Sequence, residues 1–464
     1  MVFSSLLFLF LFLPSVIIVY YSAPRRVKNV ILLIASLIFY AWGEPVYILL
    51  MLFSTFADYF FGLLMERATI GRLWRKWVVA LSVFVNLAVL GFFKYADFLI
   101  ANLNAWLGTT IPPSDLPLPI GISFYTFQSM SYIIDVYRGK TKAQRNWLDF
   151  ATYVSLFPQL VAGPIVQYGA IANQLRDRVM NNALFAEGIR RFITGLAKKV
   201  LLANNIGLLW QTVSSHSADT MPALTAWIGI LAFAFQIYFD FSGYSDMAIG
   251  LGMMFGFRFN ENFNKPYIAQ SITDFWRRWH ISLSSWFRDY VYIPLGGNRR
   301  GLLIQLRNIL IVWMLTGIWH GASWNFLVWG LYFGVILMAE KWIVLRLLKR
   351  IPRWLRHSYA LFLILMGWVL FAFDELSRGM AYFMALLGGN GAPLWNGESL
   401  YLLYTNTILL VLLIAASLPI REIAQRHDIR IHPILGLGWH AMLLLASVAY
   451  LVDATFNPFL YFRF

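Results

Sequence analysis

The sequence contains no cysteine. A thiol nucleophile, a disulfide bond and a zinc site with cysteine ligands are therefore excluded, because each of them needs a cysteine sulfur. If the protein forms a covalent intermediate, another side chain must carry it, and a thioester on the enzyme is impossible.

Charged residues are scarce as well. They make up 13% of the 464 residues, against 59% hydrophobic residues and a mean hydropathy of +0.64, whereas soluble domains carry roughly a quarter charged residues. A soluble fold of this composition would expose large apolar patches. The apolar residues form continuous runs suited to membrane helices, not the alternating pattern of barrel strands. We therefore expect an all-α, polytopic membrane protein with about eleven or twelve membrane segments.

The basic residues indicate the topology of these segments. The 37 Lys and Arg residues give a net charge of +15, but they lie in short clusters between apolar runs. This is the pattern of cytoplasmic loops, so the charge does not indicate nucleic-acid binding. The first apolar run, Met1–Tyr21, has no positive charge before it and is followed by Arg25, Arg26 and Lys28. A cleaved signal peptide has the reverse order. We expect an uncleaved first helix with an extracytoplasmic N-terminus.

The middle of the chain is less regular. Phe157-Pro158 and Gly163-Pro164 interrupt an otherwise apolar stretch. Non-helical backbone at membrane depth is tolerated where it is buried in protein or lines a cavity, which predicts a re-entrant element here. No soluble domain, linker or internal repeat is evident. We therefore expect residues 1–464 to form a single integral membrane domain.

Polar residues inside apolar stretches are the first candidates for function, because ionisable groups are costly in a bilayer. Asp240 and Asp246 lie six residues apart in such a stretch, on different faces of an ideal helix. Gly243 between them could break the helix and let both carboxylates reach one cavity. Alternatively, each carboxylate pairs with an arginine or with backbone groups and holds helices together. The sequence leaves both interpretations open.

A second polar group extends from Ser271 to Asp289 and mixes Trp with Arg. This composition predicts an amphipathic helix at the membrane interface. Ser271, with Asp274 three residues later, resembles an N-terminal cap, and Asp274 and Arg278 are correctly spaced for an ion pair. His280 lies within this segment, where a lone histidine is usually an interface residue without a chemical role.

His320 stands in a more unusual place. It follows an apolar run of about a dozen residues, lies between Gly317 and Gly321, and has Trp319 and Trp324 near it in the sequence. A neutral imidazole readily takes a proton near physiological pH. The glycines suggest close approach of a substrate or of another backbone segment. For His320 we favour a functional role over a structural one.

These residues resemble the membrane-bound O-acyltransferase family, most closely its alginate and peptidoglycan O-acetylation branch. The resemblance covers nearly the whole chain. It includes PIGISFYTFQSMSYIIDVYRG and FPQLVAGPI, and its densest part extends from YFDFSGYSDMAIGLG through FWRRWHISLSSWFRDYVYIPLGG to WHGASWNF. It implies a central tunnel between a cytoplasmic acyl donor and an outward-facing acceptor, in the bacterial inner membrane. The family's catalytic histidine corresponds to His320, and its second polar position corresponds to His280.

The resemblance also implies the reactants. A cytoplasmic thioester, with acetyl-CoA favoured, would donate the acetyl group, and a separate extracytoplasmic partner of esterase type would complete its transfer to a polysaccharide. His320 would act as general base or would carry the acetyl group transiently. His280 would line the cytoplasmic entrance or polarise the thioester carbonyl. Candidate substrate-binding residues are Asp240, Asp246, Trp319, Trp324, Arg277 and Arg278. Positive potential toward the donor's phosphates would come from Arg277, Arg278, Arg288, Arg299 and Arg300. No metal and no permanently bound cofactor are expected, and the basic face would contact anionic membrane lipid.

Three alternatives remain at this point. The acceptor could be peptidoglycan instead of an alginate-like polysaccharide, because the motifs are common to both branches. The protein could be a polysaccharide or ion-coupled transporter, since carriers also contain intramembrane carboxylates and broken helices. A non-catalytic scaffold of a polysaccharide-modifying complex would tolerate His320→Ala.

Overall fold

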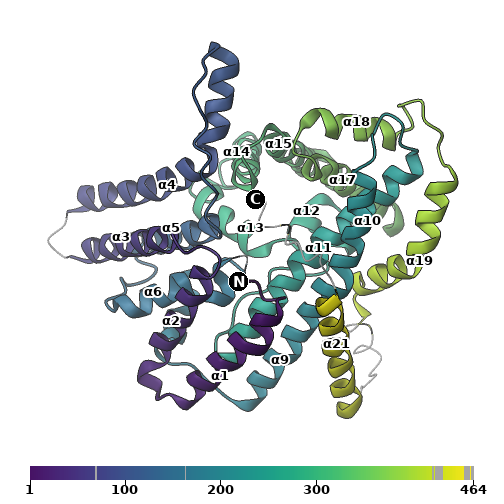
Figure 1. Ribbon diagram of the computed structural model, residues 1–464. Coiled ribbons are helices and arrows are strands. Elements are labelled where there is room, and N and C mark those ends of the chain that lie inside the picture. The colour runs from purple at the N-terminus through teal and green to yellow at the C-terminus, as the bar shows by residue number, and fades with distance from the viewer. Residues whose placement is uncertain (68–70, 162, 421–422, 424–431, 454–459, 461–464) are drawn as a thin grey trace. The chain divides into compact units, whose positions relative to one another are not determined.

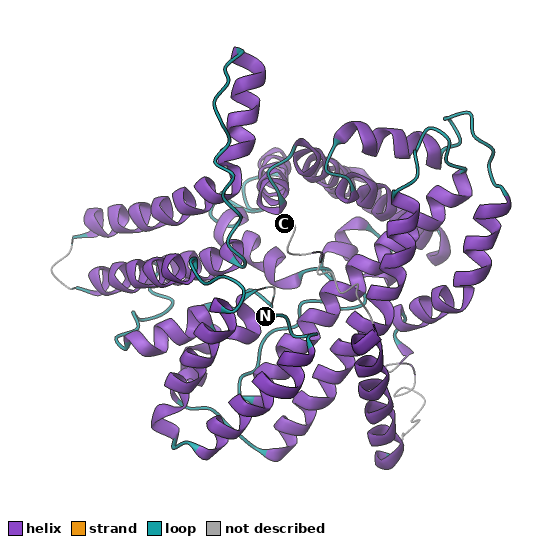
Figure 2. Cartoon of the chain, viewed as in Figure 1, coloured by secondary structure: helices purple, strands orange, loops and turns teal. Residues whose placement is uncertain are grey.

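The computed structural model describes all residues except 68–70, 162, 421–422, 424–431, 454–459 and 461–464. Every regular element among the described residues is helical (Figure 2). The all-α prediction is confirmed. Helices are expected because a chain in lipid must satisfy its backbone hydrogen bonds internally, and a helix does so within one segment.

Two compact units make up the chain, one from Met1–Ile193 with Tyr244–Asn260 and the other from Thr194–Gly243 with Glu261–Phe464. The first unit contains most of the N-terminal helices (Figure 1). These are η1 (Phe8–Phe12), α1 (Leu13–Ser22), η2 (Arg25–Val27), α2 (Lys28–Ala41), α3 (Ile48–Glu66), α4 (Arg72–Leu107), α5 (Ile122–Tyr137), α6 (Trp147–Ser155), α7 (Phe157–Leu160), α8 (Tyr168–Arg176) and most of α9 (Asn182–Ala197).

The second unit contains most of the remaining helices. They are η3 (Lys198–Asn204), α10 (Asn205–Ser214), most of α11 (Ala223–Met254), η4 (Pro266–Ile268), α12 (Ile272–Trp276), α13 (Ile281–Phe287), η5 (Arg288–Tyr292), α14 (Leu302–His320), α15 (Trp324–Ala339), η6 (Glu340–Val344), α16 (Leu345–Leu348), α17 (Arg353–Ala372), α18 (Leu376–Leu386), α19 (Gly397–Ser417) and α21 (Pro433–Asp453).

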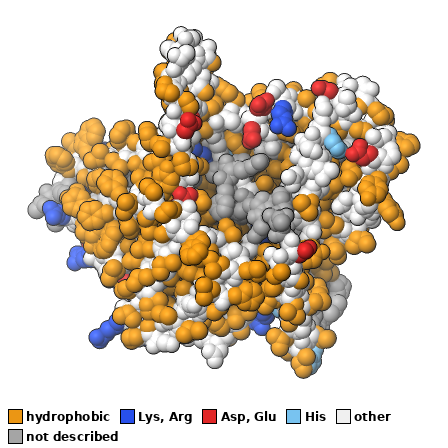
Figure 3. Space-filling model, viewed as in Figure 1, with side chains coloured by type: hydrophobic (Ala, Val, Ile, Leu, Met, Phe, Trp, Pro, Cys, Tyr) orange, Lys and Arg blue, Asp and Glu red, His pale blue; other side chains and the backbone are white. Residues whose placement is uncertain are grey.

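Eight helices in the described part of the chain are long and apolar enough to cross a membrane. They include α4, α11, α14 and α17, and a continuous helix from Asn182 to Ser214. Other helices are shorter, among them α1 with η1, α2, α5 and α15. Hydrophobic side chains cover most of the face in Figure 3, as expected for a surface in contact with lipid. The prediction of a multi-pass membrane protein is confirmed.

Polar side chains join neighbouring helices inside the first unit. Helices α3 and α4 lie side by side (Figure 1), and the fully buried Asp58 of α3 accepts hydrogen bonds from α4. Ser82 Oγ donates at 2.7 Å and Asn86 Nδ2 at 2.9 Å. Such hydrogen bonds between helices hold them together where lipid provides no hydrophobic drive.

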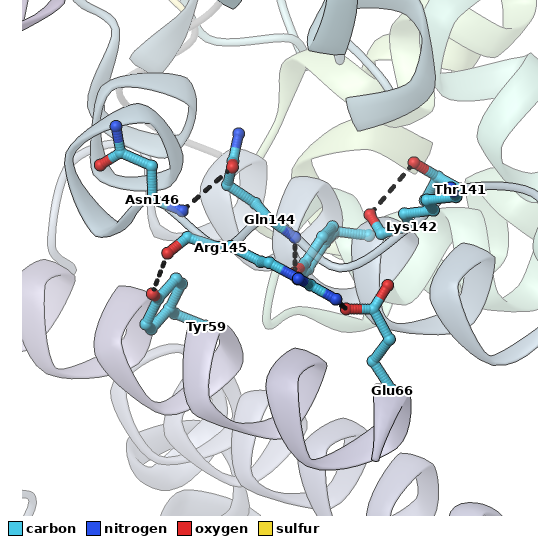
Figure 4. A network of polar contacts seen from close by, with 8 residues as sticks. Tyr59, Glu66, Thr141, Lys142, Gln144, Arg145 and Asn146 are labelled. Carbon is cyan, nitrogen blue, oxygen red and sulfur yellow. Dashed lines mark hydrogen bonds and ion pairs between the residues drawn. The ribbon is translucent and has the colours of Figure 1, made fainter. Parts of the chain in front are cut away.

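The basic loop after α5 is anchored on α3 (Figure 4). Tyr59 Oη donates to the Arg145 carbonyl at 2.7 Å, and the Arg145 guanidinium lies 3.4 Å from the Glu66 carboxylate. Asn146 caps α6 by accepting a hydrogen bond from the Leu148 backbone N–H. Specific contacts therefore hold a loop that the sequence identifies only by its positive charge.

The helices are interrupted where the sequence predicts a re-entrant element. Helix α6 ends at Ser155, α7 lasts only from Phe157 to Leu160, and the chain is non-helical from Gly163 to Gln167. Most of this stretch is buried, and Ser36 Oγ accepts a hydrogen bond from the Phe157 backbone N–H at 3.0 Å. The irregular backbone is thus surrounded by protein, which is the condition that a re-entrant element must meet.

The proposed helix break at Gly243 is wrong. Helix α11 continues without interruption from Ala223 to Met254. A Cβ at position 243 would lie 2.7 Å from the Gly195 carbonyl oxygen and 3.0 Å from the Lys199 backbone nitrogen. Glycine is needed here because two helices meet backbone to backbone.

Candidate active site

Both predicted histidines line one cavity of about 230 Å³ in the second unit. Its walls come from α12, α13, η5, α14, α15 and η6. The indole side chains of Trp276, Trp279 and Trp313 contribute to these walls. The histidines are 40 positions apart in the sequence, so the fold and not local spacing brings them to a common space.

His320 is the last residue of α14, and the chain continues into extended backbone at Gly321. Its side chain is buried, with 4% exposed. The centroid of its ring lies 5.0 Å from those of Trp319 and Trp329 and 5.3 Å from that of Phe371. An aromatic enclosure of this kind excludes water, so polar interactions inside it are stronger than in solution.

The glycines near His320 serve the approach of another backbone segment, one of the two possibilities that the sequence leaves open. Helices α14 and α15 run side by side (Figure 1). A Cβ at Gly317 would overlap the Phe326 carbonyl oxygen and lie 3.3 Å from Gly330 Cα. Small residues at a crossing let two membrane helices approach closely. This crossing holds the end of α14, and with it His320.

The replacement Gly317→Leu should therefore destabilise the protein. Overpacking of a tight contact typically costs about 1–3 kcal/mol, and here the obstacle is rigid backbone. Thermal unfolding in detergent, followed by size-exclusion chromatography, measures the effect. Gly91→Leu is the matched control, because a Cβ at Gly91 in α4 meets no atom within 4 Å. Equal stability of the two variants would contradict the close crossing.

His280 lies where the predicted interfacial helix is interrupted. The segment forms two short helices, α12 and α13, separated by turns, so the prediction of one continuous amphipathic helix is wrong. The predicted cap is confirmed, since Ser271 Oγ accepts from the Asp274 backbone N–H at 3.0 Å. His280 adopts a left-handed conformation with φ +45°, which is rare outside glycine. Burial lowers the pKa of its imidazole to about 3, so the ring is neutral at pH 7.

Cationic side chains line the same cavity. Arg277, Arg288 and Lys341 are part of its wall, and Arg288 also pairs with Asp289 at 2.8 Å. Arg278, in contrast, forms the predicted ion pair with Asp274 at 2.8 Å and is not among the lining residues. The positive charge favours an anionic substrate group at the cavity.

Glu340 positions this part of the site, although the sequence analysis missed it. It is fully buried, and its carboxylate accepts hydrogen bonds of 2.7 Å from the backbone N–H groups of Ile272 and Thr273. These two amides begin α12 and have no partner within that helix. Glu340 therefore fixes the helix that carries Trp276 and leads to Arg277. The available signal in the sequence was an acidic residue at the end of an apolar run.

Asp240 and Asp246 each form an ion pair. Asp240 lies 2.8 Å from Lys199 Nζ, with both side chains about 3% exposed. It also accepts a hydrogen bond from the Leu460 backbone N–H at 2.8 Å. Asp246 lies 2.8 Å from the Arg191 guanidinium. Neither carboxylate lines the cavity of the two histidines, and both contacts match the interpretation that they hold helices together.

The two predicted tryptophans differ in their surroundings. Trp319 is buried between the histidines, with its ring centroid 6.1 Å from that of His280 and 5.0 Å from that of His320. Trp324 begins α15 and is 46% exposed. Trp329, one and a half turns further along α15, encloses His320 instead. Residues a few positions apart lie on different faces of a helix, so closeness to His320 in the sequence does not show which tryptophan contacts it.

The arrangement is suited to proton transfer and acyl transfer. It offers two imidazoles, an apolar enclosure and positive charge at one cavity. No group of three or more potential metal ligands occurs within the described residues. Imidazole can act as a general base or as a nucleophile without a metal.

The sequence of this chain is similar to those of known membrane enzymes. A sequence model of the membrane-bound O-acyltransferase family matches residues 142–381, which include every residue lining the cavity. A probable alginate O-acetylase of Azotobacter vinelandii is 41% identical over 100% of both chains. A peptidoglycan O-acetyltransferase of Helicobacter pylori is 35% identical over 85% of this chain and 81% of its own. A teichoic acid D-alanyltransferase of Bacillus subtilis is 28% identical, over 50% of this chain and 62% of its own.

Proposed function

This chain belongs to the membrane-bound O-acyltransferase family, and from that premise we propose that it is the membrane O-acetyltransferase of an exopolysaccharide modification system. Acetyl groups would pass from a cytoplasmic thioester donor, acetyl-CoA, across the inner membrane to an extracytoplasmic polysaccharide. The observation that carries this proposal is that His280, His320 and three cationic side chains line the same cavity.

The proposed chemistry uses His320 as the reactive imidazole. As a general base, it removes the proton of the attacking hydroxyl while that oxygen forms a bond to the thioester carbonyl carbon. The carbon–sulfur bond then breaks, and the imidazolium returns the proton to the departing thiolate. Alternatively, the imidazole nitrogen attacks the carbonyl carbon, the carbon–sulfur bond breaks, and the thiolate leaves with the N–H proton of the ring. A hydroxyl oxygen then displaces the acetyl group from the ring, and the proton of that hydroxyl returns to the imidazole. Both routes regenerate the neutral imidazole and consume one thioester.

The donor is supported by the charge around the cavity. Arg277, Arg288 and Lys341 together would attract the phosphates of acetyl-CoA. The basic loops predict that this end of the site faces the cytoplasm, with the N-terminus on the opposite side. A partner of esterase type outside the membrane would then pass the acetyl group to the sugar hydroxyl.

An alginate-like polysaccharide is the favoured acceptor. The support is the 41% identity to a probable alginate O-acetylase over the full length of both chains. Peptidoglycan is the second candidate acceptor, because a peptidoglycan O-acetyltransferase is 35% identical.

Membranes that contain the protein, together with its extracytoplasmic partner, should transfer labelled acetyl from acetyl-CoA to alginate oligomers. Peptidoglycan fragments serve as the competing acceptor, and membranes without the protein as the control. If donor binding is electrostatic, higher salt should raise the KM for acetyl-CoA. Transfer to peptidoglycan fragments and not to alginate oligomers would identify peptidoglycan as the acceptor. Solute movement without any acetyl transfer would instead favour a transporter.

A further inference from the structure

A buried asparagine contacts the ring of His280. Asn262 is fully buried, and its Oδ1 lies 3.1 Å from His280 Nδ1. The same oxygen accepts hydrogen bonds from the Ser282 backbone N–H at 3.2 Å and from Ser282 Oγ at 2.9 Å. Three polar groups thus converge on one amide oxygen beside the cavity.

Backbone hydrogen bonds hold this asparagine in register with the histidine. The Ile281 backbone N–H donates to the Asn262 carbonyl at 2.9 Å, and the Asn264 backbone N–H donates to the Arg278 carbonyl at 2.9 Å. Phe263, between the two asparagines, packs its ring against Trp279, with centroids 5.1 Å apart. These contacts fix the position of Asn262 relative to the ring of His280.

These contacts determine which nitrogen of His280 carries the proton. A backbone N–H can only donate, so the amide atom facing Ser282 must be the oxygen Oδ1. An amide oxygen can only accept, so His280 Nδ1 must donate to it. In a neutral imidazole one nitrogen is protonated and the other holds a lone pair. His280 therefore has its proton on Nδ1 and its lone pair on Nε2.

We propose that Asn262 is a positioning residue that fixes His280 as the Nδ1–H tautomer, so that Nε2 serves as an acceptor for an O–H or N–H group of the substrates. The proposal rests on the acyl-transfer function proposed above. It assigns His280 a role different from polarising the thioester carbonyl. In this tautomer Nε2 carries no proton, so it cannot donate a hydrogen bond to a carbonyl oxygen. The two histidines of the cavity then have distinct roles, with His320 at the reacting carbonyl and His280 orienting a donor group of the substrate.

The surroundings of His280 favour a neutral ring. The Phe241 ring lies edge-on at 4.8 Å and the Trp319 ring at 6.1 Å. Asp240, next to Phe241 in α11, is paired with Lys199. The titratable and charged groups that line the same cavity are His320, Tyr292, Arg277, Arg288 and Lys341. Burial is the cause of the lowered pKa of His280.

Two substitutions at Asn262 distinguish the effect of its acceptor oxygen from the effect of its side-chain volume. Asn262→Leu removes the acceptor at similar volume, and we expect kcat to fall by about 10–100-fold, the loss found when the partner that orients a metal-bound histidine is removed. Asn262→Asp keeps an acceptor oxygen, and we expect kcat within about fivefold of wild type at pH 8. Asn264→Ala is the control in the same segment, since the Asn264 side chain is exposed, and its activity should equal that of wild type.

The pH dependence distinguishes positioning from a purely structural contact. A carboxylate at position 262 favours the imidazolium and raises the pKa of His280 by about 1–3 units. Protonation removes the Nε2 lone pair, so Asn262→Asp should lose activity toward the acid side, between about pH 4 and 6. Equal losses in Asn262→Asp and Asn262→Leu would overturn the proposal, and so would full activity of Asn262→Leu in folded protein.

Chemical modification tests the same contact without acetyl transfer. Diethylpyrocarbonate reacts with an unprotonated imidazole nitrogen, and trypsin releases residues 279–288, in which His280 is the sole histidine. The rate at His280, measured by mass spectrometry, should be constant from pH 5 to 8 in wild type and Asn264→Ala. In Asn262→Asp it should fall toward pH 5. An unchanged profile in Asn262→Asp overturns the proposal. If the profile shifts but wild type transfers no acetyl group, the acyl-transfer function fails and the tautomer assignment stands.

Discussion

Replacement of His320 by alanine should lower acetyl transfer by about 10²–10⁴-fold, which is the usual contribution of a general base. The side chain is buried in an aromatic enclosure and lines the cavity that also contains His280. Among the described residues that line this cavity, His280 is the only other histidine, and it is held by its contact with Asn262, so it would have to move to replace His320. Initial rates with labelled acetyl-CoA, at equal amounts of folded protein, measure the loss.

His440→Ala is the matched control for this prediction. His440 lies in α21 and contacts the Gly436 carbonyl of its own helix at 2.7 Å, so its removal should leave the rate unchanged. A trapped acetyl group on the peptide with His320, after incubation with donor alone, would distinguish the carrier role from the general base. Undiminished transfer by folded His320→Ala would make His320 structural and favour a scaffold or a transporter.

The second large effect concerns the ion pair of Lys199 and Asp240. Both side chains are almost fully buried and lie 2.8 Å apart. Lys199→Met leaves a buried carboxylate without its cation, which typically costs about 3–5 kcal/mol. The double variant Lys199→Met/Asp240→Asn removes both charges, and the new amide oxygen can still accept from the Leu460 backbone N–H. We expect it to recover most of the lost stability, as measured by thermal unfolding in detergent.

The pair of Arg191 and Asp246 provides an internal comparison. Its side chains are 24% and 15% exposed, so Arg191→Met should cost less than Lys199→Met, because water partly solvates the remaining carboxylate. Activity of the double variant at positions 199 and 240 then decides between the two interpretations of Asp240. Recovery of both stability and acetyl transfer is expected for a pair that holds helices together. Recovery of stability alone would instead support a substrate-binding role for Asp240.

Local features of the site could be predicted because they depend on residues a few positions apart. Ser271 caps α12 and Asp274 pairs with Arg278 as their spacing indicates. The break near Phe157 also follows from local residue types, since proline and glycine disfavour a continuous helix. The error at Gly243 has the opposite origin. Its conformation depends on a neighbouring helix at Gly195, which no local pattern identifies.

The class of the protein follows from the sequence alone, and so does the choice of His320 as the candidate for its chemistry. Continuous apolar runs require helices in lipid. The apolar context of His320, near glycines and tryptophans, favours a functional role for that residue. The surroundings of that histidine, in contrast, follow only from the fold. Asn262 meets His280 across 18 positions, and Glu340 holds the start of α12 across 68. Such contacts depend on helix packing and the direction of side chains, which the spacing of residues along the chain does not specify.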